Sequence, residues 1–290
     1  MLLLLGSIIL TSYLTLCFKA TERLRINTFQ AIVFNYLTCV ITGSVFNGHF
    51  PVNASAVQQP WFPWALLMGG CFIIIFNIVG FTTQQLGVSV ASVANKLSLV
   101  IPFLFSLFLY HEAARTGKLA GIVLALLAVY LTMKPASPAA AKKHSGWLLL
   151  LPVLLFISSG LLDTLIKYTE QRFLNESNNN DFLVTAFTSA ATIGLLLLLL
   201  LVLTKRQQFE YKAVLAGIAI GIPNYFSIWC LVMVLKQYAG NSSAILPINN
   251  MGIVLFSALA AWLIFKERLS LLNWIGIALA LLAIALIAFG

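Results

Sequence analysis

Residues Phe18–Leu24 read FKATERL and residues Ile166–Arg172 read IKYTEQR, so the pattern Lys-x-Thr-Glu occurs twice, 148 positions apart. The chain between them is mostly apolar. Only 9% of all residues are charged and 61% are hydrophobic, whereas a soluble domain carries roughly 25% charged residues. Such a chain cannot cover a water-facing surface, so we expect an integral membrane protein in which the repeated tetrad marks an internal repeat.

The apolar segments have the length of membrane-spanning helices. A helix that rises 1.5 Å per residue needs about 20 apolar residues to cross roughly 30 Å of hydrocarbon, whereas barrel strands are shorter and alternate. We therefore predict an all-α polytopic protein of the cell (inner) membrane. The ten expected spans are approximately Leu2–Phe18, Thr28–Phe46, Trp64–Thr83, Val88–Tyr110, Lys118–Met133, Trp147–Tyr168, Phe182–Leu203, Ala213–Leu235, Asn241–Phe265 and Leu271–Phe289.

A linker divides the chain into two halves of five helices. It is Lys134–Gly146, KPASPAAAKKHSG, which is rich in Pro, Ala and Lys. We predict a first five-helix repeat over residues 1–134, a linker over 135–146 and a second repeat over 147–290. Because five is odd, the second copy enters the membrane from the opposite side, as in the inverted repeats of many secondary transporters.

Further motifs recur in the same order in the two halves. Gly69 and Gln85 match Gly221 and Gln237 at an offset of 152, and Asn95, Glu112 and Gly121 match Asn250, Glu267 and Gly276 at an offset of 155. The offset grows in steps, as insertions between two copies would make it. The motifs together therefore support the repeat.

The tetrads Lys19–Glu22 and Lys167–Glu170 end corresponding helices, and two interpretations stay open. A lysine can extend to the lipid headgroups with a glutamate one turn away on the same helical face, which would finish each helix at the interface. The tetrads could instead form matching outer and inner gates, for which Glu112 and Glu267 are further candidates.

Two long stretches resemble the EamA-type transporters of the drug/metabolite transporter superfamily. They are VASVANKLSLVIPFLFSLFLYHEAARTGKLAGIVLALLAVYL from Val90 and KERLSLLNWIGIALALLAIALIAFG from Lys266. Both contain a small-residue-rich helix, a Glu at its end, a short loop, and Trp or Leu-x-Gly opening the last helix. The residues that fit are Glu112, Gly121, Glu267, Trp274 and Gly276. The chain departs from the family at His111 and Lys266, where members often have Gly before the Glu. The resemblance implies ten helices in two halves and a secondary transporter or exporter of small metabolites.

The basic residues lie in short clusters between apolar runs, which is typical of membrane loops and not of a nucleic-acid site. Loops on the face opposite the amino terminus hold eleven Lys and Arg, and loops on its own face hold five. The positive-inside rule then places both termini outside the cytoplasm. The resemblance implies the reverse, so the orientation stays open.

Two ionisable residues are expected at membrane depth, where a charge is expensive and indicates function. With the expected spans centred near Leu99 and Ile157, Lys96 and Asp163 differ in depth by roughly 13 Å at 1.5 Å per residue, so a direct ion pair is not expected. Lys96 could bind a carboxylate or phosphate, or it could be a structural charge bonded to carbonyls of an interrupted helix. Asp163 is a candidate proton-coupling carboxylate, or a group held by a lysine or backbone partner near the interface.

Polar and aromatic residues beside prolines in the eighth and ninth expected spans are further candidates. Prolines free backbone carbonyls, and interrupted helices near the midplane bind ligands in many transporters. The candidate substrate-binding residues are Lys96, Asn95, Ser92, Asn77, Asn224, Tyr225, Trp229, Asn249 and Asn250. Each asparagine could instead join helices.

Three classes of function compete. The first is a secondary transporter of a small polar or amphipathic metabolite, working by alternating access as an exporter or exchanger. The second is a flippase for a lipid-linked carrier on the same scaffold, which needs a basic headgroup site at one interface. The third, a polytopic membrane enzyme, is disfavoured because three scattered histidines form no catalytic cluster.

The four cysteines lie singly in apolar runs, so we expect no metal and no cofactor. Expected partners are a small-molecule substrate and membrane lipids, with protons as a candidate coupling ion and a homodimer as a candidate assembly.

Overall fold

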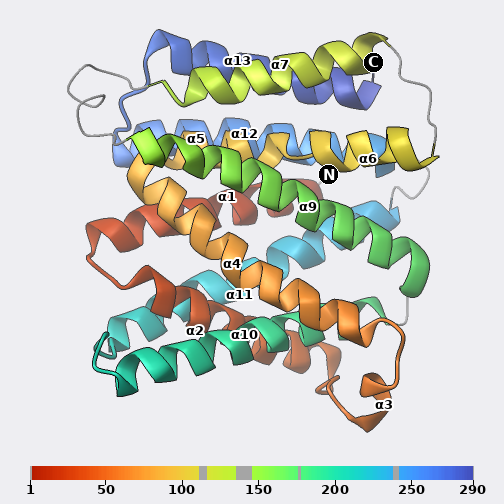
Figure 1. Cartoon of the computed structure of the whole chain (residues 1–290), viewed down its shortest axis with the longest axis vertical. Coiled ribbons are helices and arrows are strands. Elements are labelled where there is room, and N and C mark those ends of the chain that lie inside the picture. Colours follow the sequence, from red (N-terminus) through yellow and green to blue (C-terminus); the bar gives the residue numbers. More distant parts are fainter. Residues whose placement is uncertain (1, 111–115, 135–145, 176–177, 238–241, 290) are drawn as a thin grey trace. The chain divides into compact units, whose positions relative to one another are not determined.

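The computed structural model describes residues 2–110, 116–134, 146–175, 178–237 and 242–289, and all regular structure in these ranges is helical (Figure 1). The helices are α1 (Leu2–Arg23), α2 (Thr28–Asn47), α3 (Ala54–Val57), α4 (Phe62–Leu86), α5 (Val88–Leu97), α6 (Val100–Tyr110), α7 (Thr116–Thr132), the 3-10 helix η1 (Gly146–Leu149), α9 (Leu150–Phe173), α10 (Asn179–Leu203), α11 (Tyr211–Gln237), α12 (Ser242–Phe265) and α13 (Leu271–Phe289). The predicted all-α fold class is confirmed.

In the described ranges, nine helical segments are long and apolar enough to cross a membrane. The remaining predicted span corresponds to α7, an apolar helix of 17 residues. The count of ten spans and the inverted arrangement stay predictions at this point. One boundary differs clearly from the sequence-based expectation, because α9 continues from Tyr168 to Phe173 and its midpoint therefore lies nearer Asp163.

The contacts divide the chain into two compact units, each built from segments of both halves of the sequence. Unit 1 comprises Met1–Lys19, Ile78–Asp163 and Phe226–Gly290, and unit 2 comprises Ala20–Asn77 and Thr164–Tyr225. The units therefore differ from the predicted repeats, whose boundary at the linker lies mostly outside the described residues.

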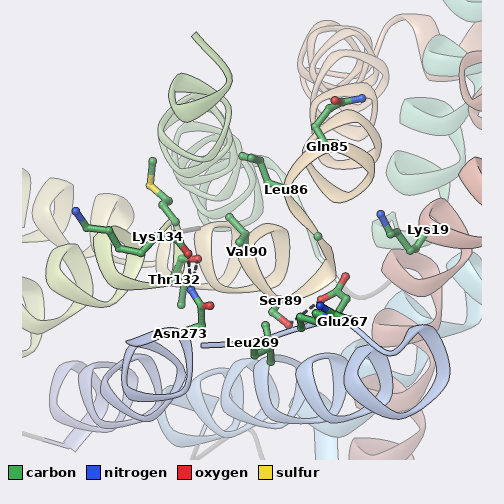
Figure 2. Close-up of a pocket in the computed structure, with 13 residues that line it drawn as sticks. Lys19, Gln85, Leu86, Ser89, Val90, Thr132, Lys134, Glu267, Leu269 and Asn273 are labelled. Carbon is green, nitrogen blue, oxygen red and sulfur yellow. Dashed lines mark hydrogen bonds between the residues drawn. The ribbon is translucent and has the colours of Figure 1, made fainter. Parts of the chain in front are cut away.

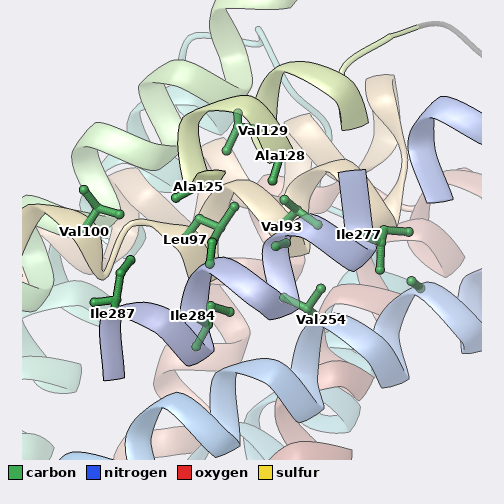
Figure 3. Packing of buried hydrophobic residues seen from close by; sticks show 13 residues of the cluster. Val93, Leu97, Val100, Ala125, Ala128, Val129, Val254, Ile277, Ile284 and Ile287 are labelled. Carbon is green, nitrogen blue, oxygen red and sulfur yellow. The ribbon is translucent and has the colours of Figure 1, made fainter. Parts of the chain in front are cut away.

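Unit 1 is centred on α7 and α13, which lie side by side and antiparallel (Figure 1). Glycines allow this close approach. A Cβ on Gly121 would lie 2.8 Å from Ile287 Cγ1, and a Cβ on Gly276 would lie 2.8 Å from Thr132 Cγ2. The core around this pair is apolar and includes side chains of α5 and α12 (Figure 3). Small residues at helix contacts are the usual basis of helix packing in membranes.

Unit 2 contains a second antiparallel pair, α2 and α10. A Cβ on Gly43 would lie 2.6 Å from Val184 Cγ2, and a Cβ on Gly194 would lie 2.9 Å from Val33 Cγ2. Tyr36 is fully buried in this unit and donates a hydrogen bond from its hydroxyl to the carbonyl oxygen of Phe72 at 2.9 Å. This buried hydroxyl therefore has a partner on a neighbouring helix, as buried polar groups usually do.

Candidate functional site

The expected fourth span is interrupted in its middle. Helix α5 ends at Leu97, helix α6 begins at Val100, and Ser98 and Leu99 between them form a turn in which Ser98 keeps helical dihedrals. Pro102 explains the position of the break, because proline lacks an N–H and its ring clashes with the carbonyl four residues earlier, which belongs to Ser98. Non-helical backbone at membrane depth is tolerated where it is buried in protein or lines a water-filled cavity. Ser98 is fully buried.

Lys96 lies in the last turn of α5, next to the break. A cation is favourable there because the carbonyl ends of a helix carry partial negative charge. Its side chain is partly buried, as is that of Asn95. Ser92, one turn earlier, is 3% exposed, and its hydroxyl oxygen has no hydrogen-bond partner within the described chain. The last turn of α5 thus presents a cation and polar groups at the break.

Helix α9 passes directly over this break. A Cβ on Gly160 would lie 2.8 Å from the Ser98 carbonyl oxygen and 2.5 Å from Ile101 Cδ1, so only glycine fits. One turn later, Asp163 Oδ2 lies 3.3 Å from Ser98 Oγ. The Asp163 side chain is exposed, whereas Ser98 is buried, so the carboxyl group reaches the break from its open side.

Lys96 and Asp163 interact electrostatically without a direct ion pair. Each charge acts on the other, but in the described ranges no nitrogen–oxygen contact within 4.0 Å joins them. The lack of a direct ion pair agrees with the expectation from the sequence. The depth difference of roughly 13 Å, estimated with a rise of 1.5 Å per residue, stays a prediction.

The remaining predicted binding residues divide between the two units. In unit 1, Asn249 is 3% exposed and its Oδ1 has no partner among the described residues, while Asn250 is partly buried. Trp229, also in unit 1, makes an edge contact with the ring of Phe226. A single cavity lined by the predicted residues of both units stays a prediction.

In unit 2, the predicted binding residues have structural partners. Asn224 donates from Nδ2 to Asn35 Oδ1 at 3.1 Å, which joins α11 to α2. Asn77 donates to the carbonyl oxygen of Ile73 in its own helix at 2.7 Å. Tyr225 is 2% exposed. These contacts fit the alternative in which the asparagines join helices.

The prolines singled out in the sequence do not interrupt their helices. Helix α11 continues through Pro223 and α12 continues through Pro247. Sequence reasoning missed Pro102, although it lies six residues after Lys96 in the run NKLSLVIP, and it missed Ser98 and Gly160 as well. A proline following the charged residue within two turns was the available signal.

Of the predicted gate residues, Glu267 has the clearest structural role. Its carboxylate accepts hydrogen bonds from the backbone N–H of Val88 at 2.7 Å and from the Ser89 hydroxyl at 3.2 Å, and so it caps the amino terminus of α5. Gly87 makes the turn before α5 with a φ of +104°, which favours glycine. Glu112, its partner in the repeat, lies outside the described residues.

The tetrads lie at helix ends, as predicted. Lys19 donates from Nζ to the carbonyl oxygen of Gln84 at 3.2 Å. Glu22 is exposed in the last turn of α1, and Lys167 and Glu170 are exposed near the end of α9. Their role as gates stays a prediction.

A pocket of about 230 Å³ lies in unit 1 at the amino terminus of α5 (Figure 2). Lys19, Lys134 and Arg268 line it together with Glu267. Asn273 closes one side, because its Nδ2 donates to the carbonyl oxygens of Thr132 at 3.0 Å and Lys134 at 2.9 Å. The Lys134 ammonium lies 4.4 Å from the centre of the Tyr130 ring. Lys19 and Arg268 therefore stand against one carboxylate, Glu267, which is already bonded to α5, and the pocket keeps an excess of positive charge.

Three comparisons relate the chain to other proteins. Residues 145–289 match the EamA-like transporter family. A protein of Haemophilus influenzae (strain ATCC 51907 / DSM 11121 / KW20 / Rd), itself uncharacterized, is 30% identical over 267 residues, which are 88% of this chain and 86% of that protein. A crystal structure of a protein that is 18% identical superposes with a TM-score of 0.61 over 98% of this chain and 95% of that one. At this identity the superposition shows a shared fold.

Proposed function

We propose that this multi-pass integral membrane protein, which belongs to the EamA-like transporter family of the drug/metabolite transporter superfamily, is a secondary transporter. Its substrate is a small polar or amphipathic metabolite, and it works by alternating access as an exporter or exchanger. The observation that carries the proposal is the charged break in unit 1. Lys96 ends α5 beside it, and Asp163 reaches it from α9. Ionisable groups at an interrupted helix halfway across the membrane are typical of substrate and ion sites in transporters.

Many alternating-access transporters are built from two inverted copies, and exchanged contacts within each unit support this arrangement here. In unit 1, Gly121 packs on Ala283 and Ile287 while Gly276 packs on Ala128 and Thr132. An offset of 155 residues converts each contact into the other. The two helices are antiparallel, so the relation between them is a local two-fold axis and not a translation. That is what an inverted repeat would produce.

Unit 2 supports the same relation independently. Gly43 packs on Val184 and Gly194 packs on Val33, and an offset of 151 exchanges the two contacts. A third set follows the same rule, because Gly69 packs on Ser189 of α10 and Gly221 packs on Thr38 of α2. The offsets of 152 and 155 are those of the sequence motifs, and 151 lies between the motif offsets of 148 and 152.

The charged break, with Lys96 from the first copy and Asp163 from the second, has no counterpart at the positions that the repeat relates to it, which supports a functional role for it. At an offset of 155, Met251 corresponds to Lys96 and Ser257 corresponds to Pro102, and α12 is accordingly continuous. At an offset of 148, Thr15 corresponds to Asp163. Packing residues are shared between the copies and the charged residues are not, so the charges are not needed for the common scaffold.

In the proposed mechanism, Lys96 holds an anionic group of the substrate and the neighbouring polar groups of α5 and α12 orient it. Asp163 is protonated while the substrate is bound to Lys96, and it releases this proton when the substrate leaves. The ammonium of Lys96 then has two alternative counter-anions, the substrate and the ionised Asp163. Competition between them couples proton movement to substrate movement.

The pocket at the amino terminus of α5 favours a second candidate function, a flippase for a lipid-linked carrier. Lys19 and Arg268 would supply the basic headgroup site that such a protein needs at one interface. The two candidates predict different sensitive residues, because a transporter depends on Lys96 and a flippase depends on the pocket.

The experiment that tests the proposal measures uptake and efflux of candidate anionic metabolites by the full chain in proteoliposomes, with and without a pH gradient. The variant Lys96→Met introduces the residue of the second copy and should raise the half-saturating substrate concentration about ten- to hundredfold, because a hydrogen bond to a charged group contributes about 1.5–3 kcal/mol. Lys212→Met, at an exposed lysine of α11, is the matched control and should transport normally. Equal transport by both variants would rule out the anion site.

A further inference from the structure

We propose that the pocket at the amino terminus of α5 binds the phosphate of an anionic phospholipid of the surrounding leaflet, and that this lipid stays bound as a partner of the protein. The pocket lies entirely in unit 1, and Lys96 is not among its lining residues. The inference goes beyond metabolite transport. It also differs from the flippase candidate, in which the same pocket would pass the lipid on to the other leaflet.

The charges that line the pocket favour a phosphate. Arg268 is exposed in the turn between α12 and α13, and it makes no hydrogen bond or ion pair with another described residue. Lys19 lines the pocket from α1, and its Nζ donates to the neutral carbonyl oxygen of Gln84. The carboxylate of Glu267 already accepts two hydrogen bonds from the start of α5. A guanidinium and an ammonium thus line one cavity of about 230 Å³, and both groups bind phosphate oxygens well.

The pocket lies at the depth of the lipid headgroups. Three helices end around it, α4 at Leu86, α7 at Thr132 and α12 at Phe265, and apolar helices end where the hydrocarbon ends. Tyr130 and Trp262 lie within one turn of two of these ends and are exposed, as is typical of aromatic side chains at a membrane interface. Basic pockets between membrane helices bind anionic lipid headgroups in other proteins.

An apolar surface for the acyl chains begins beside the pocket. One face of α7 exposes Leu119, Val123, Leu126 and Tyr130, at the spacing of a single helical stripe. The stripe runs from the pocket end of α7 toward the hydrocarbon. A soluble phosphate compound would leave this surface unused, so the chemistry of the site favours a lipid over free phosphate.

Hydrogen bonds hold the inner walls of the pocket (Figure 2). Asn273 Nδ2 donates to the carbonyl oxygens of Thr132 and Lys134, which fixes the end of α7 to α13. Glu267 fixes the start of α5 to the turn before α13. A headgroup that moved deeper would have to break these contacts, so we expect it to stop in the pocket and stay bound.

The test measures lipid binding by the full chain in mild detergent. The protein is titrated with phosphatidylglycerol or with zwitterionic phosphatidylcholine, and bound lipid is counted by native mass spectrometry. Arg268→Gln and Lys19→Gln should each weaken binding of phosphatidylglycerol about tenfold, the effect of losing one charged hydrogen bond, and should leave binding of phosphatidylcholine unchanged. Arg206→Gln and Lys212→Gln, at exposed basic residues of unit 2, are the matched controls and should bind both lipids as the unsubstituted chain does. Gel filtration checks that each variant is folded.

Two soluble competitors identify the source of the phosphate. Inorganic phosphate and glycerol 3-phosphate carry the charge of the headgroup without acyl chains. At millimolar concentration, neither should displace phosphatidylglycerol from the unsubstituted chain.

Three results would overturn the inference. The first is equal binding of phosphatidylglycerol by the pocket variants and the controls. The second is displacement of the lipid by millimolar phosphate, which would make the pocket a site for a soluble anion. The third is labelled phosphatidylglycerol that crosses the bilayer of proteoliposomes faster with the unsubstituted chain than with Arg268→Gln, which would make the lipid a cargo. None of these measurements involves Lys96, so metabolite transport can succeed or fail separately.

Discussion

Adjacent glycines in α4 should respond in opposite ways to the same substitution. A Cβ on Gly69 would lie 2.5 Å from Ser189 Cβ and would also collide with the carbonyl oxygen of Ala186, whereas a Cβ on Gly70 would meet only Ile193 Cδ1, at 3.8 Å. A backbone carbonyl cannot rotate away, so Gly69→Ala must separate α4 from α10. Overpacking of this kind costs about 1–3 kcal/mol.

The size of the effect follows from comparing the two variants. Both substitutions gain about 1 kcal/mol from the higher helix propensity of alanine, so this contribution cancels in the difference. We therefore expect Gly69→Ala to have a free energy of unfolding about 1–3 kcal/mol below that of Gly70→Ala. Gly70→Ala should be as stable as the unsubstituted chain or slightly more stable. Gly221→Ala, which corresponds to Gly69→Ala in the inverted repeat, should be destabilised to a similar extent because its Cβ would lie 2.5 Å from Thr38 Cβ.

The assay is reversible unfolding of the purified chain in mixed micelles, followed by circular dichroism as the fraction of denaturing detergent rises. Equal stability of Gly69→Ala and Gly70→Ala would refute the close packing of α4 on α10. A stable Gly221→Ala beside an unstable Gly69→Ala would refute the equivalence of the two contacts.

Three further predictions concern the break and the helix ends around it. Pro102→Ala restores the missing backbone N–H, so α5 and α6 should join, and transport should fall while gel filtration shows a folded protein; normal transport would show that the break is not needed. Glu267→Ala removes the acceptor for Val88 N–H and should lower the free energy of unfolding by about 1 kcal/mol, the usual loss for a helix cap, whereas an unchanged value would contradict the capping role. Asn273→Asp places a carboxylate against the carbonyl oxygens of Thr132 and Lys134. In the same unfolding assay it should lower the free energy of unfolding more than Asn273→Ala does. The reverse order would contradict the assigned hydrogen bonds.

Much of the fold could be predicted because lipid leaves few alternatives. Apolar runs of about 20 residues must form helices in a bilayer, and their positions followed from hydropathy with errors of a few residues. The clearest error is at the end of α9. Charged and polar residues after Tyr168 suggested a loop, but α9 continues to Phe173.

The candidate site was harder to derive, because its residues come from different helices. Lys96 and Asp163 could be identified singly, since each is an ionisable residue in an apolar run. Their relation depends on Gly160, which allows α9 to approach Ser98, and sequence spacing contains no information on that contact. Pro223 and Pro247 drew attention because they stand beside asparagines, but Pro102 makes the break. A helix that contains proline can bend or break, and the surrounding packing decides which occurs.

The most direct test of alternating access is two-sided labelling of Asn95→Cys in a chain whose native cysteines, Cys17, Cys39, Cys71 and Cys230, are replaced by alanine. A membrane-impermeant thiol reagent is added to either side of sealed proteoliposomes at acidic and basic pH. We expect labelling from both sides, with the favoured side changing with pH, and no such change when Asp163→Asn is added. Labelling from one side only under all conditions would contradict alternating access at the break between α5 and α6.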